Sequence, residues 1–219
     1  MLSGKGIWTS AYKRFTHSTN IAGIGKFTRV TIPMSEDTTF TLGAPTTVQS
    51  ANVIMGAGEA SGSGGLTTYR SWIKPDFSTI PAGKIFSTVS LFLTPTSDNS
   101  SNARTLSLHR CLRTLVVTQA TWDIFSTGNN WGTAGASNAT TDYEGAILLG
   151  STSIPASPTL NVPIEISLNP QNIQKLYDGT YTNNGIVWFV DTQSSDLIRY
   201  ASMDNPTTEY RPYIIIEYV

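Results

Sequence analysis

The residues best suited to bind a ligand lie in segment 120–135, which combines two tryptophans with several glycines and asparagines. Trp131 follows Asn129 and Asn130 directly. A flat indole ring beneath a pyranose, with polar groups at the edge of the sugar, is an arrangement that suits saccharide binding. These three residues are therefore a candidate glycan contact. Packing of Trp131 beneath its own loop is the competing interpretation, and it is the one we favour.

Catalytic chemistry finds little support in the sequence. No G-x-S-x-G, P-loop or G-x-G-x-x-G motif is present. His17 and His109 are isolated from each other, and no spacing links either to a zinc site or a triad. Cys111 is the only cysteine and lies in an apolar run, so we expect a buried, inert thiol and no intrachain disulfide. The chain is predicted not to be an enzyme; a hydrolase using paired carboxylates stays as the third alternative.

Two pairs of acidic residues have the oxygen ligands that calcium prefers. Asp142 lies close to Glu144 in the sequence, and Asp191 lies close to Asp196. Solvated or hydrogen-bonded loop carboxylates are the simpler interpretation for both pairs. No cofactor is therefore predicted, and a structural calcium is only an alternative.

Charge divides the chain into two parts. Five cations and no acid precede Glu36, whereas nine Lys or Arg and fifteen Asp or Glu follow from that position onward. A basic arm on an acidic body can dock onto an acidic neighbour, and a solvated basic tail is the alternative. Nucleic-acid binding is not expected, because five dispersed charges make a weak electrostatic footprint. The candidate docking residues in the arm are Lys5, Trp8, Tyr12, Lys13 and Arg14.

The pattern of the remaining chain predicts strands almost throughout. Apolar residues alternate over 162–168 and 213–218, and a continuous apolar run covers 185–191. Further strands are predicted around 69–77, 89–93, 106–108 and 196–202, with Trp72, Trp122 and Trp188 in the core. Residues 170–177 predict the one helix, because Pro170 suits its first turn and Gly179 ends it. Residues 56–66, which are rich in glycine, are expected to form a flexible loop.

These elements predict an all-β fold: an antiparallel β-sandwich, jelly-roll-like, with one short helix and an N-terminal arm. Residues 1–36 form the arm and residues 37–219 form the single domain. The N-terminus lacks the apolar core of a secretory signal, and no apolar stretch approaches transmembrane length. We therefore expect production in a reducing cytoplasm, or excision from a longer precursor, and no association with membranes.

Four segments in this order resemble the DNRLRE domain family. They are residues 69–83, which include Ser78-Thr79-Ile80-Pro81-Ala82-Gly83; the strand 89–93; the segment 121–142; and the closing 210–218, with Arg211-Pro212-Tyr213. The first departs from the family pattern, since Pro75-Asp76-Phe77 replaces the usual Phe-Asp, and residues 1–36 have no counterpart. The resemblance covers roughly residues 37–219 and implies a non-catalytic jelly roll related to carbohydrate-binding modules.

Members of that family are found on polysaccharide-active enzymes, in cell-surface proteins and in bacteriophage structural proteins. The resemblance implies that related modules bind acidic polysaccharides such as alginate, for which a basic groove is expected. The cations that could contribute to it are Arg70, Lys74, Arg104, Arg110 and Arg113.

The leading hypothesis is a phage virion surface protein, such as a capsid decoration, head-fibre or tail-associated subunit. Its arm docks it onto other virion proteins, either the major capsid or tail proteins, and it is expected to form a homo-oligomer. We expect it to be assembled in the host cytoplasm and displayed on the virion surface. The alternative is a carbohydrate-binding module that recognises a surface polysaccharide, as an extracellular protein or as part of a secreted enzyme.

Overall fold

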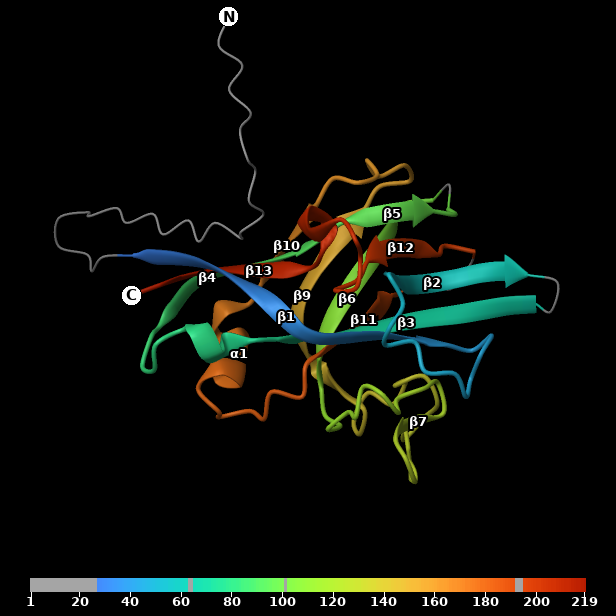
Figure 1. The fold of residues 1–219 in the computed structure, drawn as a ribbon, viewed down its shortest axis with the longest axis horizontal. Coiled ribbons are helices and arrows are strands. Elements are labelled where there is room, and N and C mark those ends of the chain that lie inside the picture. Colours follow the sequence, from blue (N-terminus) through green and yellow to red (C-terminus); the bar gives the residue numbers. More distant parts are fainter. Residues whose placement is uncertain (1–26, 63–64, 101, 192–194) are drawn as a thin grey trace, which may run out of the picture.

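The computed structural model describes residues 27–62, 65–100, 102–191 and 195–219. This part of the chain is almost entirely β, and its elements follow one another along the chain as drawn in Figure 1. The strands are β1 (Thr28–Thr41), β2 (Ile54–Gly62), β3 (Gly65–Pro75), β4 (Phe86–Leu93), β5 (Pro95–Asp98), β6 (Arg104–Cys111), β7 (Ile124–Ser126), β8 (Asn129–Asn130), β9 (Tyr143–Ile154), β10 (Ile164–Leu168), β11 (Ile186–Val190), β12 (Ile198–Ala201) and β13 (Tyr213–Tyr218). The helix α1 spans Pro170–Tyr177, and two 3-10 turns, η1 (Phe77–Thr79) and η2 (Thr208–Tyr210), complete the set.

Eight of these strands form a closed antiparallel barrel in the order β1-β13-β4-β10-β9-β6-β11-β3, and β3 pairs with β1 to complete the ring. The predicted antiparallel β-sandwich, or jelly roll, is therefore wrong, although the prediction of a nearly all-β chain with one short helix is correct. The ring closes because β1 is long enough to pair twice, through residues 28–33 with β13 and through residues 34–41 with β3. A register irregularity between Met34 and Glu36 separates the two halves, and such bulges bend a strand.

The strands β9 and β10 meet at a single paired position, Gly150 opposite Leu168. A Cβ atom on Gly150 would lie 2.6 Å from the carbonyl oxygen of Ser167, so any larger residue would push the two strands apart. Glycine at this position therefore allows the barrel to close on this side.

Three strands extend the sheet beyond β3, in the order β3-β2-β12-β5. Residues 56–66 were predicted to be a flexible loop. Residues 56–62 instead belong to β2 and residues 65–66 begin β3, with Gly58 opposite Tyr69 and Gly62 opposite Gly65. The prediction failed because a run of Gly, Ala and Ser shows no alternation of apolar and polar side chains. The backbone groups of these residues nevertheless pair with β3. Side chains of this extension, Met55 and Tyr200 among them, join the same buried cluster as the barrel interior.

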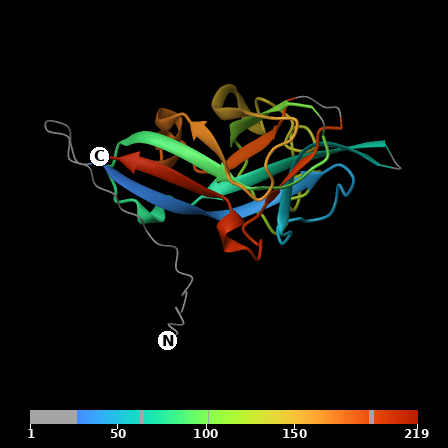
Figure 2. The same ribbon diagram turned by 90° about the horizontal axis from the view of Figure 1, so that it is seen from above.

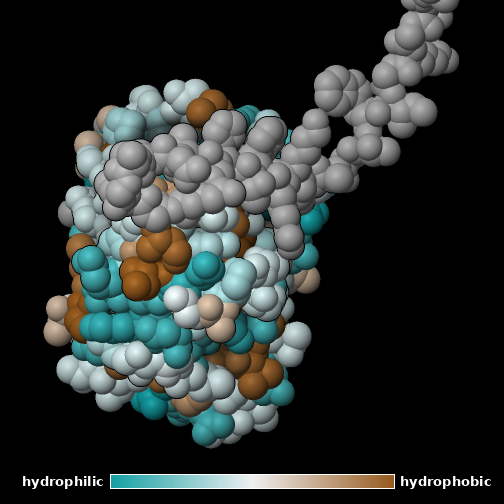
Figure 3. Space-filling model, turned by 90° about the vertical axis from the view of Figure 1, so that its left-hand side faces the viewer, coloured by the Kyte–Doolittle hydropathy of each residue, from teal (hydrophilic) through white to brown (hydrophobic). Residues whose placement is uncertain are grey.

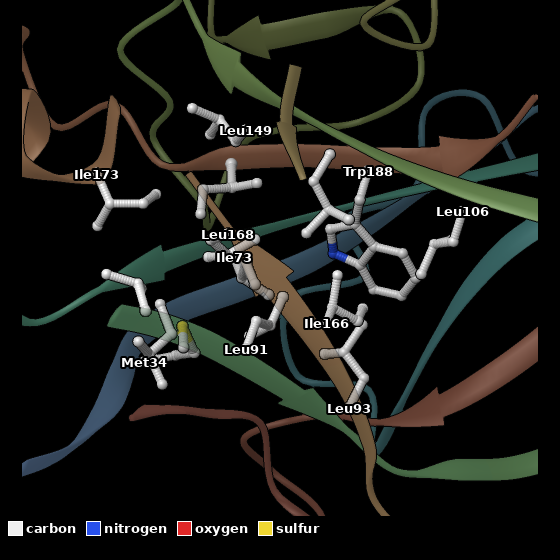
Figure 4. Packing of buried hydrophobic residues seen from close by; sticks show 14 of the residues in the cluster. Met34, Ile73, Leu91, Leu93, Leu106, Leu149, Ile166, Leu168, Ile173 and Trp188 are labelled. Atoms are coloured by element: carbon white, nitrogen blue, oxygen red, sulfur yellow. The ribbon is translucent and has the colours of Figure 1, made fainter. Parts of the chain in front are cut away.

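Alternating residues of the barrel strands point inward and form the main core. Figure 4 shows Leu91 and Leu93 of β4, Ile166 of β10 and Leu106 of β6 around Trp188 of β11. Trp72, Trp122 and Trp188 are all buried, which confirms the prediction that they are core residues.

The helix α1 spans the residues that the sequence predicts. The side chain of Asn169 accepts the backbone N–H of Asn172 and thereby caps the helix, and Pro170 occupies its first turn. Ile173 and Leu176 are buried against the main core. The helix lies beside the start of β4, at the end of the barrel where the C-terminus is found (Figure 1).

The barrel begins earlier in the chain than predicted. Strand β1 starts at Thr28, and Ile32 and Met34 are buried in the core, so residues 28–36 belong to the barrel and not to the arm. Val30, Ile32 and Met34 alternate along this stretch, but the proline between the last two is disfavoured in strands and weakened the strand signal in the sequence. Figures 1 and 2 both show the start of β1 beside the C-terminal strand, because Thr28 pairs with Tyr218. The candidate docking residues Lys5, Trp8, Tyr12, Lys13 and Arg14 lie outside the described residues.

Candidate functional site

Residues 112–142 form a layer of loops and the small hairpin β7–β8 on the outside of the barrel wall. We call this segment the loop layer. Beneath it, the outward side chains of β1, β3, β6 and β11 form a second apolar cluster with its tryptophans. The members of that cluster are Phe40, Trp72, Cys111, Leu115, Ala120, Trp122, Trp131, Ala136 and Val187.

Trp131, the central residue of the candidate glycan contact, belongs to this cluster and is only 5% exposed. Its indole N–H donates to the backbone oxygen of Thr121 at 3.0 Å. Its ring contacts Phe40 edge-on at a centroid distance of 5.1 Å and Phe125 at 5.5 Å. The ring is thus used to pack the loop layer onto the barrel, and its faces are not open for stacking on a sugar.

The two asparagines lie next to this ring but point elsewhere. Asn129 and Asn130 are exposed on β8, and Asn129 donates to the hydroxyl of Ser126 within its own hairpin. Asn130 and Trp131 line a hollow of about 550 Å³ together with Asp123. The structure therefore brings two of the three candidate residues to one hollow, where the Trp131 side chain is too buried to stack on a sugar.

Asp142 organises the loop layer, a role that sequence reasoning missed. Its carboxylate is fully buried, and one oxygen accepts the backbone N–H of Gly132 at 2.7 Å. The other oxygen accepts the backbone N–H groups of Thr133 and Asn138, each at 3.0 Å. The guanidinium of Arg113 lies 3.3 Å from the first oxygen. Both carboxylate oxygens of Asp142 are thus used in bonds within the protein. The sequence could not predict this role, because the donors are mostly backbone N–H groups.

Trp122 is held between the barrel wall and the turn at Gly135. The backbone of Gly135 has φ +75°, and a Cβ there would lie 2.5 Å from the Trp122 ring. Gly135 donates its N–H to the carbonyl of Trp122 at 2.6 Å. Only glycine satisfies both the left-handed backbone and the close approach of the ring.

The five cations expected to form a basic groove do not form one. Arg104 pairs with Asp98, Arg110 with Glu144 and Arg113 with Asp142, so each charge is matched locally. Lys74 pairs with Glu36 on the neighbouring strand. Arg70 lies over the ring of Phe189 at 4.3 Å and donates to the carbonyl of Ala136, and burial lowers its pKa.

The carboxylate pairs considered for calcium are likewise engaged with the protein. Glu144 pairs with Arg110, Asp191 accepts the hydroxyl of Ser107, and Asp196 accepts the backbone N–H of Glu59. Within the described ranges, no group of three or more His, Cys, Asp or Glu side chains is placed to hold a metal ion.

The isolated histidine and cysteine are placed as the sequence predicts. His109 shares a 3.1 Å hydrogen bond with the carbonyl of Glu144 and stacks on Phe189 at 5.4 Å. Cys111 is buried, and that burial raises the pKa of its thiol to about 12. A thiol that stays protonated at neutral pH is a poor nucleophile, so Cys111 acts as a small apolar residue.

A larger groove, which the sequence did not reveal, lies at the end of the barrel between α1 and residues 76–85. We call it the end groove. It has a volume of about 770 Å³, with Phe77 and Tyr177 on its apolar side and Lys74, Lys84, Asp76, Asp178 and Asn183 among its polar lining residues. Figure 3 views the molecule from this end, where apolar residues form small patches in a largely hydrophilic surface.

Hydrogen bonds from side chains to the backbone hold the walls of the end groove. The hydroxyl of Tyr177 donates to the carbonyl of Pro81 and accepts the N–H of Lys84. The side-chain amide of Gln174 donates to the carbonyl of Lys84 and accepts the N–H of Phe86. Hydrogen bonds from Thr180 lower the pKa of Asp178, so this carboxylate is ionised at neutral pH.

Comparisons with known proteins add no family to these observations. No protein-family model matches the chain, and no curated protein matches its sequence. Among the residues that the structure describes, no helix has the length and apolar character needed to cross a bilayer. The resemblance to the DNRLRE family thus stays a prediction, while the sandwich that it implied is replaced by the closed barrel.

Proposed function

We propose that this chain is a non-catalytic structural and binding protein, and specifically a phage virion surface component docked through its basic N-terminal arm. The observation that carries the proposal is the distribution of charge between body and arm. Each of the ten cations in the described residues has a partner: ion pairs for Arg29, Lys74, Arg104, Arg110 and Arg113, and hydrogen bonds or aromatic rings for Arg70, Lys84, Lys175, Arg199 and Arg211.

Several exposed carboxylates of the body, in contrast, have no cation partner among the described residues. Asp123, Asp204 and Glu209 are examples on three different loops or turns. The body is therefore acidic at its surface, and the four cations of residues 1–26 are the ones left for binding an acidic neighbour. A second copy of the same body is such a neighbour, which supports a homo-oligomer.

The place where residue 27 enters the barrel also supports this arrangement. Residue 27 leads directly into β1, whose first residue pairs with Tyr218 at the C-terminal end of β13. The start of β1 and the end of β13 thus lie at one side of the molecule, as Figure 2 shows. Attachment there leaves the β2–β3 hairpin and the loop layer directed away from the docking site, as in a displayed surface protein.

Native mass spectrometry of the full chain and of a chain lacking residues 1–26 tests this proposal. The cut must precede Thr28, because Thr28 and Val30 pair with β13. We expect an oligomer that dissociates with increasing salt, and a truncated monomer that still unfolds cooperatively and fails to enter virus particles. A full chain that is monomeric and shows no incorporation would contradict the proposal.

Carbohydrate binding is the second candidate function, and the end groove is the observation that favours it. The charges of its two lysines and two carboxylates cancel. Its apolar side, next to hydroxyl and amide groups, suits a neutral saccharide. Titration of ¹⁵N-labelled protein with cellohexaose and with an alginate hexasaccharide tests this function. We expect shifts at Asn183 that Asp178→Asn weakens and Asp123→Asn, in the other hollow, leaves unchanged. Absence of shifts with both sugars would rule out the groove as a saccharide site.

A further inference from the structure

Three buried polar side chains come from the strands where the extension of the sheet joins the barrel wall. Asp98 ends β5, Arg104 begins β6, and Tyr200 lies on β12. β12 pairs with β5, so that Ile198 is opposite Asp98 and Tyr200 is opposite Pro95. The three residues therefore connect the outermost strands of the extension to a strand of the closed ring.

Most of the polar atoms in this group have protein partners. Arg104 Nη2 lies 2.5 Å from Asp98 Oδ1, and the two side chains are 0% and 9% exposed. Arg104 Nη1 donates to the carbonyl of Asn102, and Asp98 Oδ1 also accepts the backbone N–H of Ser100. One face of this buried ion pair is thus satisfied by its own connecting loop.

The other face has no partner among the residues that the structure describes. Asp98 Oδ2, Arg104 Nε and the hydroxyl of Tyr200 are each buried, and no described residue forms a hydrogen bond with them. Tyr200 lies two residues along β12 from Ile198, the residue opposite Asp98, and its ring packs edge-on against Trp188 at a centroid distance of 5.1 Å. Burial raises the pKa of Tyr200. Three unpartnered polar atoms of one cluster would cancel much of a domain's small net stability, so a partner is required.

The types of these three atoms identify that partner. Arg104 Nε only donates, Asp98 Oδ2 only accepts, and the hydroxyl of Tyr200 does both. A cation would be repelled by the guanidinium, an anion would be repelled by the carboxylate, and an apolar guest would leave all three atoms unpaired. A water molecule accepts from Nε, donates to Oδ2 and exchanges a hydrogen bond with the hydroxyl, which uses three of its four bonds.

We propose that Asp98, Arg104 and Tyr200 bind a buried water molecule that joins the β2-β12-β5 extension to the barrel wall. Water at this position completes the hydrogen bonding of a buried ion pair, which stabilises only when all its groups are satisfied. The contact therefore fixes how the extension lies on the barrel. This inference is independent of the proposed docking function, since it concerns the interior.

A crystal structure at a resolution that shows ordered water, together with nuclear Overhauser measurements on ¹⁵N-labelled protein, tests the site. We expect electron density within hydrogen-bonding distance of all three atoms, and a cross-peak between the Nε proton of Arg104 and long-lived water. Tyr200→Phe removes one of the three partners and should weaken that cross-peak several-fold. Tyr210→Phe, the same change at a half-buried tyrosine outside the cluster, should leave it unchanged.

Two results would overturn the proposal. One is a direct hydrogen bond between the hydroxyl of Tyr200 and Asp98 Oδ2 with no density between the three residues. The other is a cross-peak to water that is absent in the unmodified protein. If Tyr200→Phe does not fold, the crystal structure and the measurement on the unmodified protein still decide between these outcomes.

Discussion

Replacing Asp142 by asparagine should detach the loop layer from the barrel, although the substitution changes neither size nor shape. One carboxylate oxygen accepts the N–H of Gly132, and the other accepts those of Thr133 and Asn138. An asparagine side chain has only one acceptor oxygen, and its NH₂ group must then face one of these sets of donors. Because Asp142 is fully buried, water does not replace the lost acceptor.

The expected loss follows from the number of donors left without a partner. Turning the amide either way leaves at least one backbone N–H facing an NH₂ group and removes the charge that pairs with Arg113. Each orphaned donor costs about 1–3 kcal/mol, and the ion pair adds about 0–1 kcal/mol because the side chain of Arg113 is 32% exposed. We therefore expect Asp142→Asn to lower the free energy of unfolding by about 2–4 kcal/mol.

Urea unfolding at pH 7, followed by tryptophan fluorescence and by far-UV circular dichroism, measures this loss. Trp122 and Trp131 lie in the loop layer, so fluorescence should change before circular dichroism if that layer opens first. Asp123→Asn is the matched control, because Asp123 is exposed in the same layer, and its effect should stay within about 0.5 kcal/mol. A loss below about 1 kcal/mol for Asp142→Asn would refute the central role of this carboxylate.

Three further outcomes follow from the structure. Trp122→Ala should cost about 3–5 kcal/mol in urea unfolding, because the ring is buried between the barrel and Gly135, and a loss under about 1 kcal/mol would return Trp122 to consideration as a ligand platform. Burial raises the pKa of Asp37 from 3.8 to about 7, so the native state keeps a proton that the unfolded state loses. The stability that this group contributes is therefore full below pH 4 and is lost as the pH rises through 7. This decrease in the free energy of unfolding, at most roughly 4 kcal/mol, should disappear in Asp37→Asn. If the melting temperature of the variant still falls with pH between 4 and 7 as in the unmodified protein, other groups cause the decrease. A chain lacking residues 1–26 should keep its melting temperature within about 2 °C in calorimetry, because β1 is intact, whereas loss of the transition would show that the arm is part of the fold.

The local elements were largely readable from the sequence. The helix α1 matches its predicted bounds because a proline at the first turn, two apolar residues on one side and a glycine beyond the end all act within ten residues. Strands such as β10 and β13 were readable because alternation along one strand reports the burial of its two faces. The buried state of Trp72, Trp122 and Trp188 followed from the same patterns and from the size of the indole ring.

The candidate sites were harder to predict, because their partners are far apart in the chain. Trp131 has asparagine neighbours typical of a sugar contact, yet its environment is set by Phe40, which is distant in sequence. The end groove combines Phe77 with Tyr177, and no short motif contains both. The prediction of a basic groove failed for a related reason. Arg110 and Arg113 pair with carboxylates about thirty positions away in the chain, and Arg70 lies over the distant ring of Phe189.

The sequence by itself determined the strand content, the single helix, the core tryptophans and the separation of a basic arm from an acidic body. These properties depend on residue type and on spacing within about ten positions. The tertiary structure alone decided that the strands close into a barrel, because closure depends on β1 pairing with both β13 and β3 and on Gly150 letting β9 meet β10. It also decided the role of Asp142, because backbone N–H groups, which every residue except proline carries, leave no mark in a sequence.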